Sequence, residues 1–201
     1  AEQLEKKYDS GLQTRDTGKW LGKFVFLFSV FFAGYHYITA GIGVPVDYWH
    51  MGFHMSGVIL LVFISFPMMR GEDNKALAQN TWWRYGNVPI WDWTFILAGV
   101  AASLYIGVTW YGVDITVFGG RFQLAEQVMR QGNPAQIDVI FGTALIIVLL
   151  EAVRRTLGIV VPIIILVFTG YAVFGQYIPV QLLMHPGINW QQYICLLYTS
   201  D

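Results

Sequence analysis

The stretch that most constrains this chain runs from Ile137 to Gly175, where 39 residues are almost all apolar but carry Glu151, Arg154 and Arg155 near the middle. An apolar helix needs about 20 residues to cross the hydrocarbon core of a bilayer. The stretch is therefore long enough for two crossings, and its charges predict a water-facing corner between them. Because Glu151 precedes the two arginines by three and four positions, a helix places all three on neighbouring turns, where opposite charges offset each other.

Two interpretations of this charged group remain open. Glu151, Arg154 and Arg155 could form an ion pair at the membrane edge, where a carboxylate with cations one turn away costs less than a lone carboxylate at mid-bilayer. They could also be a packing determinant between subunits or domains. We interpret them as residues of structural coupling, because both readings give them a structural role.

The composition places the chain among membrane proteins. The sequence is 55% hydrophobic and 12% charged, and a soluble domain carries about twice that share of charge. The apolar runs predict an all-α, polytopic fold with about five transmembrane helices in contact with the lipid bilayer. We expect these helices at residues 19–43, 49–69, 89–111, 136–154 and 157–177.

The basic residues predict the orientation of the chain in the membrane. If the N-terminus lies inside, ten of the 12 lysines and arginines fall on inside segments, and only Arg121 and Arg130 fall outside. This asymmetry follows the positive-inside rule. Because the basic residues are clustered by loop and the net charge is -1, we expect no nucleic-acid partner.

The chain divides into four parts by composition. Residues 1–18 are a polar tail with too little apolar surface to order alone. Residues 19–156 form a four-helix membrane domain, and 157–194 hold a fifth helix and the start of a further region. The final CLLYTSD, residues 195–201, resembles a translated sequencing adaptor, so we expect a non-native tail that includes the single cysteine, Cys195.

Two connections carry further expectations. Asp92 stands at the start of the third apolar run, where a helix N-terminus favours an anion, and we expect it to act as a cap. In residues 121–131, Phe122, Leu124 and Val128 would share one helical face, opposite Gln123, Glu126 and Arg130. This pattern predicts a short amphipathic interfacial helix at the outer surface.

The sequence contains no phosphate-binding loop, dinucleotide fingerprint, zinc-protease motif or nucleophile elbow, so we expect no enzyme. The histidines leave one alternative open. His36 and His54 fall at similar depths in the first two helices, and a facing histidine pair is one way to hold haem iron. A b-type cytochrome or redox-chain membrane subunit is therefore the alternative function.

Transport sites of secondary transporters use helices that are broken at mid-membrane. The four mid-helix glycines of this chain are more easily interpreted as sites of close helix packing. They are Gly99, Gly107, Gly142 and Gly170. The sequence therefore indicates a scaffold rather than a substrate site.

Four motifs resemble the N-terminal part of fused TRAP transporter permeases, in which a four-helix small subunit precedes a twelve-helix large one of the TAXI type. The resemblance covers about residues 20–194, and its most specific part is the block E-A-x-R-R-x-x-G-x-x-x-P at 151–162. The other three motifs are individually weaker. They are H-x-G-F at 50–53, V-P-I-W-D-W at 88–93 and Y-A-V-F-G at 171–175.

The resemblance implies a multi-pass protein of the bacterial cytoplasmic (inner) membrane that belongs to an ion-gradient-driven importer of organic acids or amino acids. It implies two protein partners, a periplasmic substrate-binding protein and a large permease domain, in the same chain or as a separate subunit. The coupling ion, Na+ or H+, and the substrate would bind in that large domain, so no cofactor or metal is expected here. Glu151, Arg154 and Arg155 match the family block and would serve structural coupling.

Overall fold

Five long helices dominate the computed structural model, which describes residues 14–15, 17–44, 46–68, 84–85, 88–117, 120–130 and 132–199. Each is long and apolar enough to cross a membrane, so the expected all-α, multi-pass architecture is confirmed. The helices are α2 (Gly18–Ile42), α3 (Asp47–Ser65), α5 (Ile90–Thr109), α6 (Gln136–Leu157) and α7 (Val160–Phe174), which η3 (Gly175–Tyr177) extends.

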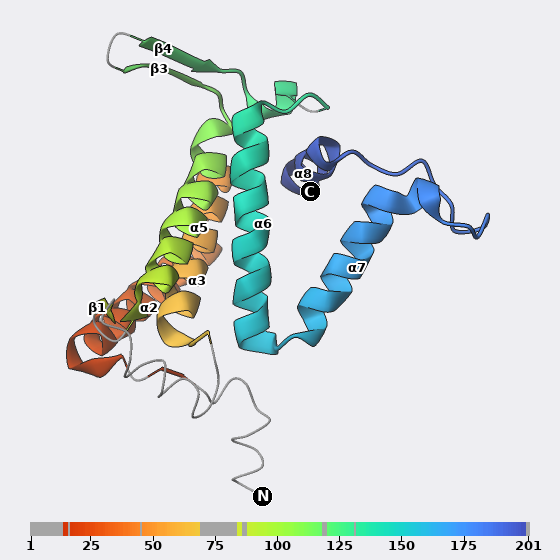
Figure 1. Ribbon diagram of the computed structural model, residues 1–201. Helices are drawn as coiled ribbons and strands as arrows, with labels where there is room; N and C mark the ends of the chain where they lie inside the picture. Colours follow the sequence, from red (N-terminus) through yellow and green to blue (C-terminus); the bar gives the residue numbers. More distant parts are fainter. Residues whose placement is uncertain are drawn as a thin grey trace, which may run out of the picture.

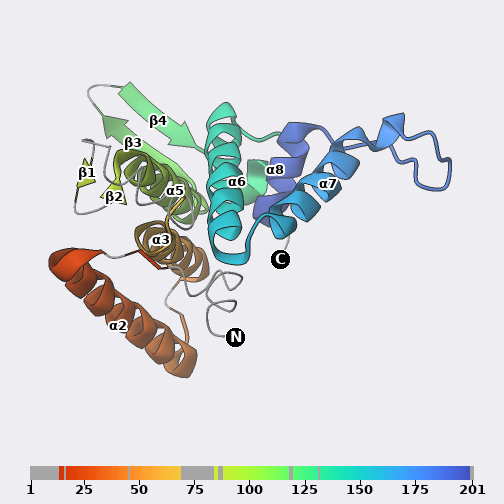
Figure 2. The same cartoon turned by 60° about the horizontal axis from the view of Figure 1, so that its bottom comes forward.

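The long helices follow one another across the structure in chain order, from α2 on one side to α7 on the other (Figures 1 and 2). Helices α3, α5 and α6 pack against one another and enclose the core. Because each helix is apolar on nearly every side, the core takes only part of that surface, and the remainder suits lipid. The buried core residues are Ile59, Phe63, Ile64, Val88, Ile96, Val148 and Ala152.

Small residues set the close approach of α3 and α5. A Cβ atom on Gly52 would lie 2.8 Å from the carbonyl oxygen of Ser103, and one on Gly107 would lie 3.0 Å from that of Tyr48. A Cβ atom on Gly99 would meet Val148 at 2.8 Å. The packing role expected of Gly99 and Gly107 is therefore confirmed, as glycine lets helix backbones come together.

The same expectation is wrong for Gly170. Nothing lies within 4 Å of the position where its Cβ atom would stand. Helix α7 diverges from α6 (Figure 1) and has only Pro162 buried, and although the neighbouring Thr169 bonds Tyr193 of α8, no described helix comes close to Gly170 itself. Gly142, by contrast, is buried in α6.

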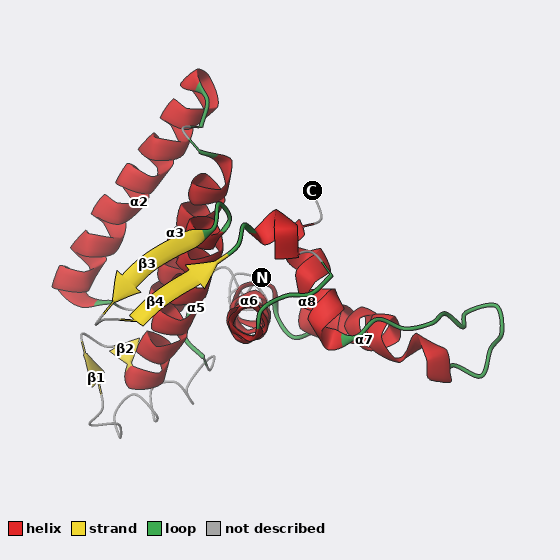
Figure 3. Cartoon of the chain, turned by 90° about the horizontal axis from the view of Figure 1, so that it is seen from above, coloured by secondary structure: helices red, strands yellow, loops and turns green. Residues whose placement is uncertain are grey.

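The bundle has two distinct ends, which we name by their contents. The arginine end holds the end of α3, the start of α5 and the end of α6 (Figure 1), together with Arg15, which bonds Ser65 and Asp92 there. The hairpin end holds the antiparallel strands β3 (Val113–Val117) and β4 (Gly120–Leu124), which lie beyond the upper ends of the helices (Figure 1) and pass across α3 and α5 in the view from above (Figure 3). If the N-terminus lies inside, the arginine end faces the cytoplasm.

The amphipathic helix predicted for residues 121–131 is wrong. Gly120–Leu124 form β4 and pair with β3, with Val113 opposite Leu124. In the rest of the described segment only Gln127–Arg130 form a helical turn, the 3₁₀ helix η2. At the base of the hairpin Gly112 has a φ of +78°, and a Cβ atom there would lie 3.1 Å from the carbonyl oxygen of Leu124. Pairing with the preceding strand β3 therefore overrode the helical pattern of apolar residues.

The remaining described elements are short. Strands β1 (Arg84–Tyr85) and β2 (Val88–Pro89) pair antiparallel before α5. Helix α8 (Trp190–Thr199) lies between α6 and α7 (Figure 1) and includes the buried Cys195, whose Sγ atom accepts a bond from the backbone N–H of Gly132 at 3.4 Å. Most of the expected tail at 1–18 and of the loop at 70–89 lies outside the described residues.

Candidate functional site

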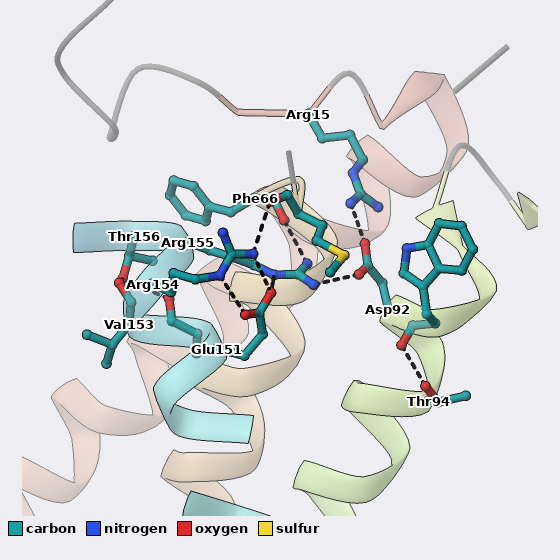
Figure 4. Close-up of polar contacts among 12 residues, drawn as sticks. Arg15, Phe66, Asp92, Thr94, Glu151, Val153, Arg154, Arg155 and Thr156 are labelled. Carbon is teal, nitrogen blue, oxygen red and sulfur yellow. Dashed lines mark hydrogen bonds and ion pairs between the residues drawn. The ribbon is translucent and has the colours of Figure 1, made fainter. Parts of the chain in front are cut away.

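The last two turns of α6 carry the charged group that the sequence predicted. Glu151 accepts two bonds of 2.7 Å from Nε and Nη2 of Arg154, one on each carboxylate oxygen (Figure 4). Nε of Arg155 donates to Oε1 of Glu151 at 2.8 Å. The ion pairs predicted at spacings of three and four residues are therefore confirmed.

The corner between the two crossings lies further along than expected. Arg154, Arg155 and Thr156 stay helical, since α6 continues to Leu157, and Thr156 donates its hydroxyl back to the carbonyl of Ala152 at 3.0 Å. The chain turns at Gly158, which has a φ of +90°. Glycine reaches this conformation without a steric cost, so the helix ends there rather than at the charged residues.

Arg155 links α6 to two other elements. Its Nη2 atom donates to Oδ1 of Asp92, at the start of α5, at 2.8 Å, and both side chains are fully buried. Its Nη1 atom donates to the carbonyl oxygen of Phe66, just past the end of α3, at 3.2 Å. The guanidinium carbon also lies 4.4 Å from the centre of the Phe63 ring. All three guanidinium nitrogens of Arg155 are thus engaged.

Asp92 does not act as the cap that the sequence suggested. In a capping box the backbone N–H of the N-cap residue donates to the side chain of the third helical residue, but the N-cap residue here is Pro89, which has no N–H. The Asp92 carboxylate instead binds two guanidinium groups, those of Arg155 and Arg15 (Figure 4). The first turn of α5 therefore supplies a buried counter-ion.

Arg15 extends the cluster to the segment before α2. Its guanidinium donates to Oδ2 of Asp92, and its backbone N–H donates to the carbonyl oxygen of Ser65 at 2.7 Å. Sequence reasoning missed this contact, because 77 residues separate Arg15 from Asp92. The arginine cluster, as we call Arg15, Asp92, Glu151, Arg154 and Arg155, thus joins the pre-α2 segment to α5 and α6, and its arginines bond the end of α3.

The chemistry of the arginine cluster suits holding helices together. Three cations face two carboxylates, and burying an unpaired charge is costly, so the pairing stabilises this arrangement over one that separates the helices. Both oxygens of Glu151 and both of Asp92 accept bonds from arginine. A substrate anion would have to displace these carboxylates, so the geometry favours a structural role over a binding one.

A smaller polar cluster lies at the hairpin end, and sequence reasoning missed it. Asp138, in the first turn of α6, accepts the backbone N–H of Ala135 at 2.8 Å and the hydroxyl of Tyr105 at 2.7 Å. It also pairs with Arg130 from η2. Asp138 thus plays the capping role that was expected of Asp92, because the N-cap residue before it is Ala135, whose backbone N–H can donate to the Asp138 carboxylate.

The histidine pair lies where the sequence placed it, but with little room between the rings. Nδ1 of His54 and Nε2 of His36 are 2.7 Å apart, and His50 bonds Tyr35 at 3.0 Å. Two axial ligands on opposite sides of an iron stand about 4 Å apart, with the porphyrin between them. The pair in this arrangement therefore does not fit a haem, and the described residues hold no group of three or more metal-binding side chains arranged for an ion.

No protein-family model matches the chain, and neither a curated protein nor a solved structure does.

Proposed function

We propose that this chain forms the membrane scaffold of a TRAP-type secondary transporter. In this proposal an ion gradient, of Na+ or H+, drives the import of organic acids or amino acids delivered by a periplasmic binding protein. The chain lies in the cytoplasmic (inner) membrane of a bacterium. A large permease domain, fused to it or separate, binds the substrate and the coupling ion.

One observation carries the proposal. Asp92 belongs to the V-P-I-W-D-W motif and Arg155 to the E-A-x-R-R block, and the two side chains form one buried ion pair. The motifs that give the family resemblance are thus contact points of the bundle. Gly52 of the H-x-G-F motif likewise lies against the backbone of α5.

The continuity of the helices supports a scaffold role over a transporting one. Each of the five candidate spans is continuous in the structure, with at most a closing 3₁₀ turn in the fifth. Transport sites are typically built from broken helices with exposed backbone groups at mid-membrane. Helix α7 also offers an apolar surface on nearly every side, which suits contact with lipid or with further membrane helices.

The proposal is tested first at the level of the gene. The source DNA should be sequenced across and beyond the codons for Tyr193 and Ile194, together with the neighbouring genes. We expect either a frame that continues into roughly a dozen further apolar segments or an adjacent gene that encodes them, with a gene for a secreted binding protein nearby. A locus with neither a large permease nor a binding protein would count against the transporter.

A further inference from the structure

Arg130 has an incomplete set of hydrogen bonds at a nearly buried position. It ends the single turn of η2 at the hairpin end, and its side chain is 10% exposed. Its Nη1 atom donates to Asp138, whereas Nε and Nη2 are buried and have no hydrogen-bond partner. Buried donors without acceptors cost about 1–3 kcal/mol each, and more when charged, so this arrangement calls for an explanation.

The two unmet donors are the side-on pair of the guanidinium group. Nε–H and one Nη2–H point in the same direction and match two oxygens of a carboxylate or phosphate. Arg154 shows this contact within the same protein, since its Nε and Nη2 atoms bind the two oxygens of Glu151 at 2.7 Å each. Arg130 has the same donor pair but no such acceptor.

The neighbouring carboxylate cannot supply the missing acceptor without losing its own bonds. Oδ2 of Asp138 already accepts bonds from Arg130 and from the backbone N–H of Ala135, and Oδ1 accepts the hydroxyl of Tyr105. These bonds fix the carboxylate on the Nη1 side of the guanidinium. The hydroxyl of Tyr105 also lies beside the guanidinium, but neither it nor any other acceptor of the described residues forms a hydrogen bond with Nε or Nη2.

The position of Arg130 identifies the class of acceptor. It precedes the membrane-crossing helix α6 by six residues, so it lies at the depth of the lipid headgroups, next to Met129, which is 78% exposed. Phosphate is the abundant bidentate oxoanion at that depth. The adjacent Asp138 carboxylate repels a doubly charged anion, which favours the singly charged phosphodiester of a phospholipid over inorganic phosphate.

We propose that the side-on face of Arg130 binds a phosphate group at the hairpin end of the bundle, with a phospholipid headgroup as the favoured source and free phosphate as the other. Both nitrogens are covered by protein, so binding requires a shift of η2. This single turn is held by backbone bonds from Met129 to Glu126 and from Asn133 to Arg130. The site is independent of the transport function proposed above.

The test uses the full chain in a neutral detergent, with thermal unfolding followed by tryptophan fluorescence. Dioctanoyl phosphatidylglycerol, dioctanoylglycerol and inorganic phosphate are titrated separately. We expect phosphatidylglycerol to raise the unfolding temperature. Arg130→Lys should weaken the apparent affinity for this lipid at least about tenfold, because lysine keeps the positive charge that pairs with Asp138 but lacks the two parallel N–H donors of arginine. Lys23→Gln, an exposed change near the start of α2 and thus far from the hairpin end, should respond as the native chain does.

Each remaining outcome also decides the question. An Arg130-dependent response to inorganic phosphate at equal or lower concentration assigns the site to free phosphate. An equal response to dioctanoylglycerol, an unchanged response in Arg130→Lys, or no response to any ligand overturns the proposal and leaves water as the missing acceptor. If Arg130→Lys does not fold, the pair Arg130→Gln with Asp138→Asn removes both charges together and should abolish the lipid response.

Discussion

Arg155 and Asp92 form an ion pair in which both side chains are fully buried and 2.8 Å separates Nη2 from Oδ1. The pair ties the last turns of α6 to the first turn of α5 at the arginine end of the bundle. Glu151 holds the Nε atom of the same arginine, and the carbonyl of Phe66 holds Nη1. One side chain thus fixes the ends of three membrane helices relative to one another.

Asp92→Asn tests how much this ion pair contributes to the free energy of unfolding. The change leaves both Arg155 and Arg15 with less counter-charge, and removing one partner of a buried pair costs about 3–5 kcal/mol. We expect a loss of about 3 kcal/mol in the free energy of unfolding, at the low end because Glu151 still holds Nε. Unfolding in mixed detergent and dodecyl sulfate micelles, followed by tryptophan fluorescence, measures it.

A double-mutant cycle separates the pair from its surroundings. Adding Arg155→Met to Asp92→Leu removes both charges, so the double variant should be more stable than the sum of the single losses by at least about 1 kcal/mol. Arg154→Gln is the matched control, because Arg154 is 32% exposed and its loss should cost about 1 kcal/mol or less. Additive single losses would show that Asp92 and Arg155 are not coupled.

Gly52→Ala tests the close packing of α3 against α5. The new Cβ atom would lie 2.8 Å from the carbonyl oxygen of Ser103, which is backbone and cannot rotate away. We expect a loss of about 1–3 kcal/mol in the free energy of unfolding. Gly41→Ala, in α2, meets nothing within 4 Å and should cause no loss. Equal stability of the two variants would contradict the packing account.

The membrane spans were predictable from the sequence because they depend on local apolar runs. The pairing of Glu151 with Arg154 and Arg155 was predictable because helical spacing alone sets it. The pairing of Asp92 with Arg155 was not, since 63 residues separate them and only the packing of α5 against α6 brings them together. A proline at the N-cap position was the available signal that Asp92 would be free for another partner.

The β-hairpin was mispredicted from the sequence for a different reason. Apolar residues within 121–131 fit one face of a helix, but Gly120–Leu124 pair with Val113–Val117 instead. The alternation of apolar and polar residues in Val113–Val117 and the Gly119–Gly120 pair were the signals for strands joined by a turn. When a short segment fits the periodicity of both a helix and a strand, its secondary structure depends on whether a partner strand is available. Local periodicity does not reveal that partner.

Absorption spectroscopy tests the cytochrome alternative. His36 and His54 bond each other at 2.7 Å instead of standing apart as the two axial ligands of an iron would, so we expect the purified chain to show no Soret band after expression with added haem precursor. A Soret band that disappears in His36→Ala or His54→Ala would contradict this account and favour a b-type cytochrome. The same spectra for His185→Ala provide the control, because His185 lies away from the pair, beside Tyr171.

Cysteine labelling tests the orientation. In a Cys195→Ser background, Asp114→Cys places a thiol in the hairpin and Thr14→Cys places one at the arginine end, and both positions are exposed. If the N-terminus lies inside, a membrane-impermeant maleimide should label position 114 in intact cells and position 14 only after permeabilisation. Labelling in the reverse order would place the arginine end outside.

The most direct test of the scaffold proposal is uptake into proteoliposomes. The complete transporter containing this chain is reconstituted, and the ligand is identified by mass spectrometry on the binding protein encoded beside it. We expect accumulation of that ligand only with an inward Na+ or H+ gradient and with the binding protein present. Accumulation should fall in Asp92→Asn in proportion to the folded fraction. Uptake that needs neither the gradient nor the binding protein, or no uptake of the identified ligand by folded protein, would contradict the account.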